Sequence, residues 1–323
     1  MEHLDSIEFH DHHPKADDFL TEVLRGLSDE PKQIPPKFFY DKRGSELFDR
    51  ITGLSEYYPT RTEIAILEAR AAEIADLVGK DSLLIEYGSG SSRKVGILLD
   101  ALQGDLTYIA IDISRKHLVE SCSRLAKVYP DVEIIAVCAD YSKPFPLPTL
   151  KRSDSKNKLV FFPGSTIGNL TPDQAVSFLC NTARQIGSGG SLLIGVDLKK
   201  DDELLNAAYN DADQVTAAFN LNVLKRINEE LDADFDLSAF RHRAFYNDTR
   251  GRVEMHIASI KSQTVELDGT SIRFDEGETI HTENSYKFTI EEFQRLAGQA
   301  GFEPVNAWTD PSNLFSLHYL RAR

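Results

Sequence analysis

The feature that most constrains the fold is a series of short apolar runs interspersed with helical stretches between Ser82 and Leu198. The runs lie at 83–87, 106–112, 132–140, 158–164 and 191–198. Strands buried on both faces of a parallel sheet have this near-continuous apolar character. The sequence therefore predicts an α/β fold whose ligands bind at the carboxyl ends of parallel strands.

The segments before and after this series have a different pattern. Helical spacing dominates before it. A helical stretch at 201–230 follows it, and then strand-like segments between 241 and 288 that resemble an antiparallel meander. A helix and two strands end the chain. We therefore expect two domains, an α/β domain formed by 62–198 with 287–323 and a smaller α+β domain formed by 1–61 with 199–286.

A glycine-rich turn follows the first apolar run, in the sequence Gly88-Ser89-Gly90-Ser91-Ser92. Glycines let a backbone pass close beneath a ligand, and the helix that follows adds unpaired N–H groups. A dinucleotide fingerprint needs a third glycine where this chain has Arg93, and the GxxxxGK[ST] pattern of a P-loop is absent. The turn therefore favours a nucleoside that carries no phosphates.

Carboxylates end the next two runs. Asp112 ends the second run, where it can accept hydrogen bonds from both hydroxyls of a ribose. Asp140 ends the third and is followed by Tyr141, a pair suited to an adenine amino group and ring. One such carboxylate is often only a helix cap. Three successive strand ends of this kind indicate a methyltransferase-type nucleoside site.

The composition narrows the partners. A formal net charge of -15 with pI ≈ 5.1 disfavours nucleic acid and suits a small cation such as a sulfonium. No apolar run is long enough to cross a bilayer, and the N-terminal fifteen residues are too polar for a signal peptide. We expect a cytoplasmic monomer with no membrane contact and no bound metal, and with a mobile N-terminal leader.

Several longer motifs give the chain a closer resemblance. Together they resemble the histidine-specific methyltransferase family, whose members make trimethylhistidine on the route to ergothioneine. The resemblance implies a Rossmann-like methyltransferase domain with a second, smaller α+β substrate domain. The motifs are PKFFYDKRGSELFDRITGLSEYYPTRTE (36–63), IEYGSGSSRK (85–94), FFPGSTIGNL (161–170), GVDLKKD (195–201), the tyrosine at 209, RVEMHI (252–257) and TENSYKF (282–288).

The resemblance implies that S-adenosylmethionine is the methyl donor. The residues expected to hold it are Gly88 and its neighbour Ser89, Lys94, Asp112, Asp140 and Tyr141.

The resemblance also implies a site for a free amino acid. Tyr40 and Tyr57 are the catalytic candidates, because their hydroxyls would orient the α-amine. Around the backbone end of the amino acid they would be joined by Gly164, and by Asn169 and Tyr209 at its carboxylate.

The rest of this expected site would bind the imidazole of histidine. Glu283 and Ser285 would recognise the ring and Met255 would line its pocket. On a strand, Glu283 and Ser285 point to one face and Asn284 to the other. A carboxylate and a hydroxyl can satisfy both imidazole nitrogens, whereas an indole has a single N–H and would leave Glu283 partly unpaired.

Other functions remain open on the sequence alone. The nearest is Nα-methylation of another aromatic amino acid, such as tryptophan or a prenylated tryptophan. A non-catalytic nucleoside-binding protein would have no use for the combined amino-acid contacts. A methyltransferase of protein or nucleic acid fits neither the acidic charge nor a site that binds a free carboxylate.

Overall fold

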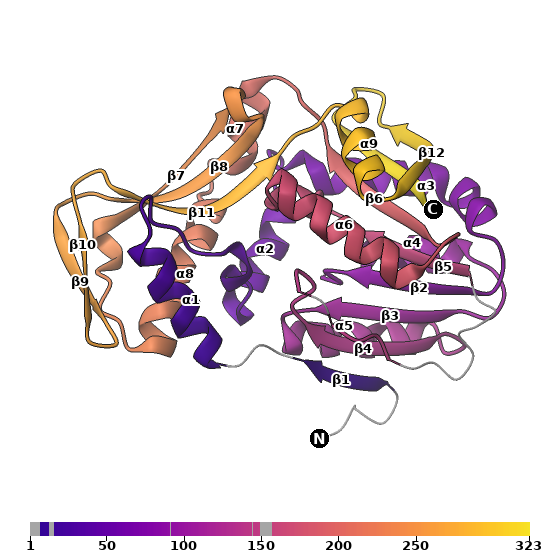
Figure 1. Ribbon diagram of the computed structural model, residues 1–323, viewed down its shortest axis with the longest axis horizontal. Coiled ribbons are helices and arrows are strands. Elements are labelled where there is room, and N and C mark those ends of the chain that lie inside the picture. The colour runs from indigo at the N-terminus through magenta and orange to yellow at the C-terminus, as the bar shows by residue number, and fades with distance from the viewer. Residues whose placement is uncertain (1–6, 13–15, 91, 144, 149–156) are drawn as a thin grey trace. The chain divides into compact units, whose positions relative to one another are not determined.

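The computed structural model describes residues 7–12, 16–90, 92–143, 145–148 and 157–323. The chain divides into two compact units, and each unit is assembled from separate stretches of sequence (Figure 1). The first unit comprises Met1–His13, Pro59–Lys199 and Lys287–Arg323, and the second comprises Pro14–Tyr58 and Lys200–Tyr286.

The first unit contains an eight-stranded sheet. Six strands are parallel, and β13 lies antiparallel between β6 and β12. Every residue of β2 and of β6 is buried, as expected for strands covered on both faces. In spatial order the strands are β1 (Glu8–His12), β4 (Glu133–Ala139), β3 (Thr107–Asp112), β2 (Ser82–Tyr87), β5 (Asn157–Phe162), β6 (Ser191–Asp197), β13 (Phe315–Ala322) and β12 (Phe302–Thr309).

Helices cover this sheet. Side chains of α3, α4 and α5 form one apolar core with the strands, and α6 and α9 contact each other, with α6 against β5 and α9 against β12 (Figure 1). The α/β fold with a mostly parallel sheet is therefore confirmed. The helices are α3 (Tyr58–Val78), α4 (Arg93–Ala101), α5 (Arg115–Val128), α6 (Pro172–Ile186) and α9 (Ile290–Gln299), with the short η3 (Thr166–Asn169) after β5.

The first strand corrects one expectation. We expected a mobile leader and placed it in the smaller domain, but residues 8–12 form β1, which pairs in parallel with β4 from Glu8↔Ile135 to His12↔Ala139. The strand is at the sheet edge, where polar side chains can remain exposed while the backbone pairs. Residues 1–6 and 13–15 lie outside the described part of the chain.

The second unit begins with helices. Helix α1 (Ala16–Ser28) is followed by η1 (Pro36–Phe39) and α2 (Lys42–Thr52), and α2 packs on α8 (Val215–Leu231). The helical stretch expected at 201–230 is interrupted, because α7 (Asp202–Tyr209) ends before α8 begins. The Asp211 carboxylate accepts from the N–H groups of Val215 and Thr216, which fixes the start of α8.

The strands of the second unit form two sheets. The expected single meander is wrong in its pairing: β11 returns to β8, giving the order β11-β8-β7, while β9 and β10 form a separate hairpin. Local alternation cannot tell which strand pairs with which. The strands are β7 (Phe240–Asn247), β8 (Arg252–Ser259), β9 (Gln263–Leu267), β10 (Thr270–Phe274) and β11 (Thr279–Tyr286), with η4 (Leu237–Ala239) and η5 (Asp248–Arg250) between them.

Within the described residues, no helix combines the length and apolar character needed to cross a bilayer.

A buried ion pair holds Lys287, the residue at which the chain re-enters the first unit, against β6. Lys287 Nζ lies 2.7 Å from Asp197 Oδ2, and both side chains are almost fully buried. Nearby, the Phe288 N–H donates to the Asp197 carbonyl and the Lys199 N–H to that of Phe288. Removing one partner of such a pair leaves an uncompensated buried charge.

We expect Lys287→Met to lower the free energy of unfolding by about 3–5 kcal/mol, because Asp197 would remain buried and charged. The measurement is urea denaturation followed by circular dichroism. The double variant K287M/D197N removes both charges and should recover part of the loss. A single variant as stable as the wild type would contradict this account of the pair.

Candidate functional site

The glycine-rich turn lies at the carboxyl end of β2, in the first unit. Gly88 has φ +73°, and the N–H groups of Gly88 and Ser89 both donate to the Ile111 carbonyl of β3, at 2.8 and 3.2 Å. Ser89 is 2% exposed, and its Oγ has no hydrogen-bond partner among the described residues. A buried hydroxyl without a partner needs one, so a polar ligand group at this turn would stabilise it.

The two acidic strand ends lie at the same edge of the sheet. β3 pairs with both β2 and β4, so Asp112 and Asp140 follow adjacent parallel strands. Asp112 Oδ1 accepts from the Ser114 N–H, and Asp140 Oδ1 accepts from the Ser142 N–H and hydroxyl. Burial raises the pKa of Asp112 above its usual range. These local bonds orient both carboxylates.

Tyr141 is held by an aromatic cluster. Its ring centroid lies 5.7 Å from both Tyr87 and Phe162, and Phe178 of α6 contacts all three rings. A β-carbon built on Gly88 would be 3.7 Å from the Tyr141 hydroxyl. The turn after β2 and the aromatic residue after β4 therefore lie together, although they are 53 positions apart (141 − 88 = 53).

Sequence reasoning missed Glu63, the residue that links two motifs of the first unit. Its side chain is fully buried in α3, with Oε2 2.6 Å from Lys94 Nζ. The Gly164 N–H donates to both carboxylate oxygens, at 3.0 and 2.9 Å. Lys94 was expected at the methyl donor and Gly164 at the amino acid, and both contact this one carboxylate.

The loop containing Gly164 has an unusual backbone. Gly164 has φ +78° and Ser165 φ +56°, and η3 then ends at Asn169. Ser165 Oγ accepts from the Asp197 N–H of β6, so the loop is tied to a central strand. This arrangement holds Asn169 on a short, fixed connection after β5. Its expected role at a substrate carboxylate remains a prediction.

Glu86 precedes the glycine-rich turn and is almost completely buried in β2. It accepts a hydrogen bond from the Tyr108 hydroxyl. Burial raises the pKa of its carboxyl from 4.5 to about 8, although Tyr108 and Lys94 act in the opposite direction. Burial therefore favours the protonated, neutral form of this carboxyl, a property that the sequence did not reveal.

In the second unit, three of the expected amino-acid contacts lie together. The Tyr209 hydroxyl donates to Ser285 Oγ at 2.7 Å, and the Tyr57 ring lies edge-on to the Tyr209 ring, with centroids 6.4 Å apart. The sequence placed Tyr209 at the carboxylate and Ser285 at the imidazole of a substrate. Tyr58 differs from Tyr57: it is 1% exposed and accepts a hydrogen bond from Lys200.

Strand register places Met255, Glu283 and Ser285 on one face of the three-stranded sheet. Glu283 pairs with Met255 and Ser285 with Val253, while Asn284 pairs with Glu254. A β-bulge between His281 and Glu283 turns these residues over, because without it 281, 283 and 285 would share a face. The bulge was not visible in the sequence.

A buried polar network supports this face. Asn220 Nδ2 donates to His242 Nδ1 and the His256 carbonyl, and Asn220 Oδ1 accepts from the Thr282 hydroxyl. His242 Nε2 therefore carries the proton and donates to the Tyr209 carbonyl at 2.9 Å. Burial lowers the pKa of His242. The network joins α7, α8, β7 and β11 and fixes the backbone at Tyr209 and Thr282.

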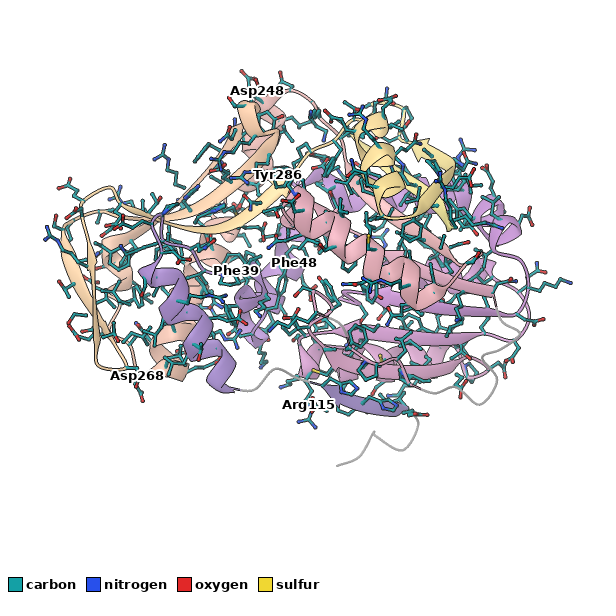
Figure 2. All side chains as sticks on the ribbon, in the orientation of Figure 1. Phe39, Phe48, Arg115, Asp248, Asp268 and Tyr286 are labelled. Carbon is teal, nitrogen blue, oxygen red and sulfur yellow. The ribbon has the colours of Figure 1, made fainter. Side chains whose placement is uncertain are left out.

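Tyr40 lies at the end of η1. Its ring packs edge-on against Phe48 and Phe219, with centroids 5.7 and 5.8 Å away. Phe39 and Phe48, which Figure 2 labels, both contact Phe219 as well. The cluster fixes the Tyr40 ring in the second unit. The expected roles of Tyr40 and Tyr57 at the α-amine remain predictions.

The sequence matches one protein family over nearly its whole length. The model of the family described as "Histidine-specific methyltransferase, SAM-dependent" matches residues 19–322. The chain belongs to this family. Its methyl donor is therefore S-adenosylmethionine, and the fold class expected from the motifs is confirmed.

Curated relatives agree with this placement. A histidine N-alpha-methyltransferase from Mycolicibacterium smegmatis is 44% identical over 308 residues, covering 94% of each chain. Another from Mycobacterium tuberculosis is 43% identical, covering 92% of each chain. Ergothioneine biosynthesis protein 1 of Neurospora crassa is 34% identical, covering 93% of this chain and 34% of its own length. A 4-dimethylallyltryptophan N-methyltransferase from Aspergillus fumigatus is more distant, at 29% identity, covering 94% of this chain and 93% of its own.

We expect Glu63→Gln to weaken S-adenosylmethionine binding and to destabilise the fold. Glutamine can still accept from the Gly164 N–H but leaves the largely buried Lys94 charge unpaired, a change that costs about 3–5 kcal/mol for a fully buried pair. Calorimetric titration and thermal melting measure the two effects. Glu68→Gln, an exposed position on the same helix, is the matched control. Equal melting curves for both variants would refute the role of Glu63.

We expect Glu86→Gln to flatten the pH dependence of stability between about pH 4.5 and pH 8. The folded-state pKa of Glu86 is raised to about 8, so the folded state disfavours ionisation and stability falls as the pH rises through this window. The slope for one group is at most about 1.4 kcal/mol per pH unit. Urea denaturation of wild type and variant at several pH values measures the difference. Parallel curves would show that Glu86 ionises normally.

Proposed function

We propose that this protein is an S-adenosylmethionine-dependent histidine Nα-methyltransferase. It transfers three methyl groups in succession to the α-amine of L-histidine and yields trimethylhistidine, a step toward ergothioneine. The observation that carries the proposal is the family match across residues 19–322, together with relatives of that activity at 44% and 43% identity.

In this proposal the first unit, which the sequence predicted as 62–198 with 287–323, binds the methyl donor. Asp112 binds the ribose hydroxyls, and Asp140 and Tyr141 bind the adenine. Gly88 and Ser89 lie beneath the donor, and the unpartnered buried Ser89 hydroxyl supports this placement. Lys94 acts at the same edge, oriented by its ion pair with Glu63.

The amino acid is recognised mainly by residues of the second unit, which the sequence predicted as 1–61 with 199–286. In the structure β1 belongs to the first unit. Glu283 and Ser285 bind the imidazole, and Met255 lines its pocket. Their common face and the Tyr209–Ser285 hydrogen bond support this assignment. Tyr209 also binds the carboxylate with Asn169, and Gly164 contributes its backbone.

The chemistry requires positioning above all. S-adenosylmethionine supplies the methyl group as an electrophilic carbon on a sulfonium. The α-amine must be neutral to attack, and Tyr40 and Tyr57 orient it through their hydroxyls. Orientation of this kind contributes roughly 7–11 kcal/mol in favourable systems. Tyrosine ring faces also stabilise the methylammonium charge that accumulates over successive transfers.

We further propose that the protein acts as a cytoplasmic monomer on a free amino acid, with no nucleic acid or membrane partner. The acidic composition, with a formal net charge of -15, supports a small-molecule substrate over a phosphate backbone. Light scattering coupled to size exclusion measures the oligomeric state directly.

The alternative substrate is tryptophan or a prenylated tryptophan, the substrate class named for the more distant Aspergillus relative. Glu283 distinguishes the two. A carboxylate facing an imidazole can accept from a ring N–H, and an indole offers its single N–H at a different place on a larger ring.

We expect purified protein with excess S-adenosylmethionine to convert histidine to its trimethyl product, read as three added methyl masses, and to leave tryptophan unchanged. Fragmentation of the product locates the methyl groups on the α-nitrogen. A monomethyl end product would overturn the successive transfers, and a preference for tryptophan would overturn the substrate.

In the same assay, Glu283→Ala should lower kcat/KM for histidine by about 10- to 100-fold, because a buried polar contact worth 1–3 kcal/mol is lost. Glu276→Gln, an exposed carboxylate of the same unit, serves as control. Unchanged histidine turnover in the Glu283 variant would remove it from the site.

A further inference from the structure

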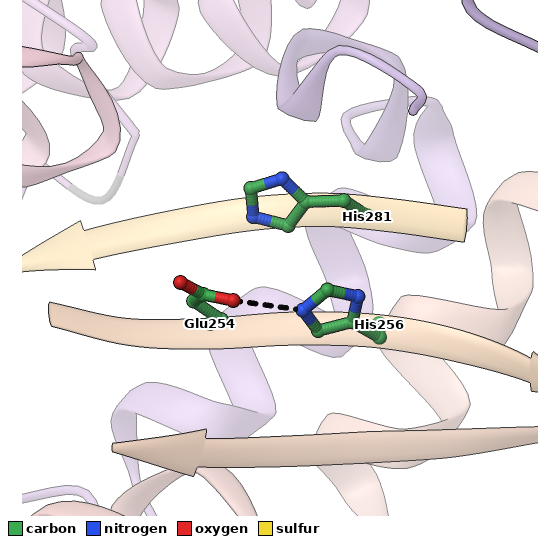
Figure 3. Close-up of side chains that lie close together, drawn as sticks. All are labelled: Glu254, His256 and His281. Carbon is green, nitrogen blue, oxygen red and sulfur yellow. Dashed lines mark hydrogen bonds and ion pairs between the residues drawn. The ribbon is translucent and has the colours of Figure 1, made fainter. Parts of the chain in front are cut away.

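The three-stranded sheet has a second polar cluster, on the face opposite Met255 and Glu283. Glu254 and His256 project from β8, and His281 projects from the facing position on β11 (Figure 3). The bulge after His281 is what separates it from Glu283. The cluster therefore belongs to neither the methyl-donor residues nor the amino-acid contacts described above.

The geometry brings one ligand atom from each residue into a small volume. The carboxylate oxygen and the two imidazole nitrogens all lie within 4.8 Å of one another, and Glu254 Oε2 is 3.1 Å from His256 Nε2. Ligands of an ion with bonds of about 2.1 Å are separated by about 3–3.5 Å. The Glu254–His256 pair already has this spacing, and small side-chain rotations bring His281 to it.

The rings have restricted freedom. His256 stacks between Phe245, with centroids 5.5 Å apart, and His281, with centroids 4.8 Å apart. Figure 3 shows the two imidazoles one above the other, with the Glu254 carboxylate beside the ring edge of His256. Burial lowers the pKa of both histidines, which favours the neutral form that offers a lone pair.

Hydrogen bonds from Arg252 and Asn247 orient the Glu254 carboxylate. Glu254 Oε1 accepts from Arg252 Nε at 2.9 Å and from Asn247 Nδ2 at 3.1 Å, and Arg252 completes an ion pair at 2.8 Å. These bonds hold Oε1 and direct Oε2 toward the rings. Metal-binding carboxylates are commonly fixed in this way by hydrogen bonds to the other oxygen.

Two further atoms on this face are buried without partners among the described residues. They are His256 Nδ1 and Asn284 Oδ1, and Asn284 is the register partner of Glu254. Buried polar atoms in native proteins are nearly always paired, so an unpaired amide oxygen beside a carboxylate and two imidazoles indicates a polar ligand.

We propose that Glu254, His256 and His281 bind a divalent transition-metal ion of the zinc class, such as Zn²⁺, Co²⁺ or Ni²⁺. Two imidazoles and one carboxylate suit these ions better than Mg²⁺ or Ca²⁺, which prefer oxygen ligands. The ion joins β8 to β11 next to the bulge. His281 is also within 3.1 Å of the Glu283 carbonyl through its Nε2, so the ion stabilises the backbone from which Glu283 projects.

The test uses the full chain after treatment with a chelator. Titration with Co²⁺ should give visible absorption bands that saturate at one equivalent and disappear when Zn²⁺ is added. Thermal melting should shift upward by several degrees with Zn²⁺. Absence of a one-to-one complex at micromolar Co²⁺ would overturn the proposal.

Variants locate the ion. His256→Asn and His281→Asn should each abolish the bands, and circular dichroism must show that each variant is folded. A matched control replaces the N-terminal histidines His3, His10, His12 and His13 with asparagine and should bind like the wild type. Loss of binding only in that control would assign the ion to the N-terminal segment and refute the site.

A measurement on the wild type covers the case in which a variant does not fold. Diethylpyrocarbonate modifies accessible neutral imidazoles, and peptide mass spectrometry identifies each modified histidine. Zn²⁺ should protect His256 and His281 and leave His10 and His12 reactive. Equal modification with and without Zn²⁺ would contradict the proposed ligands. None of these readouts depends on methyl transfer, so the metal site and the enzymatic function are tested separately.

Discussion

The buried carboxylate of Glu63 is the constraint on which the first unit depends. It receives the Lys94 ammonium from α4 and the Gly164 N–H from the loop after β5, and it lies directly against β6. A β-carbon at Gly195 would be only 2.0 Å from Glu63 Oε1, so any other residue there would displace the carboxylate. One charge therefore sets the relative positions of a helix, a loop and a strand, because a buried carboxylate must keep its partners.

The β-bulge in β11 has a comparable role in the second unit. It places Glu283 with Met255 on one face of the sheet and leaves His281 with His256 on the other. The first face is backed by the Asn220 network, and the second carries the Glu254 cluster. A single extra residue thus gives one short strand two separate sets of polar side chains. Deleting the bulge residue would move Glu283 and Ser285 together to the opposite face of the sheet.

Much of the fold could be predicted because it depends on local pattern. The apolar runs located β2 to β6, and helical spacing before and between them indicated α3 to α6. β1 was missed because an edge strand needs few apolar residues. The pairing of β8 with β11 was missed because it is made across a hairpin that local alternation does not distinguish.

The candidate site also contains residues that local sequence marks and residues that it does not. Gly88, Asp112 and Asp140 could be found because each stands at a strand end, a position the sequence marks. Glu63 could not, since its partners are 31 and 101 positions away and nothing local distinguishes it from other helical glutamates. The cross-strand contacts of His256 and His281 depend on register, which hydrophobic spacing does not determine.

The discontinuity of both units bears on how the chain is made. The polypeptide passes from one unit to the other after residues 13, 58, 199 and 286. β13 pairs with every residue of β6 but is synthesised only after residue 286. During synthesis, the edge of β6 that later pairs with β13 stays unpaired while residues 200–286 are translated. The second unit can therefore close while the first still lacks β13.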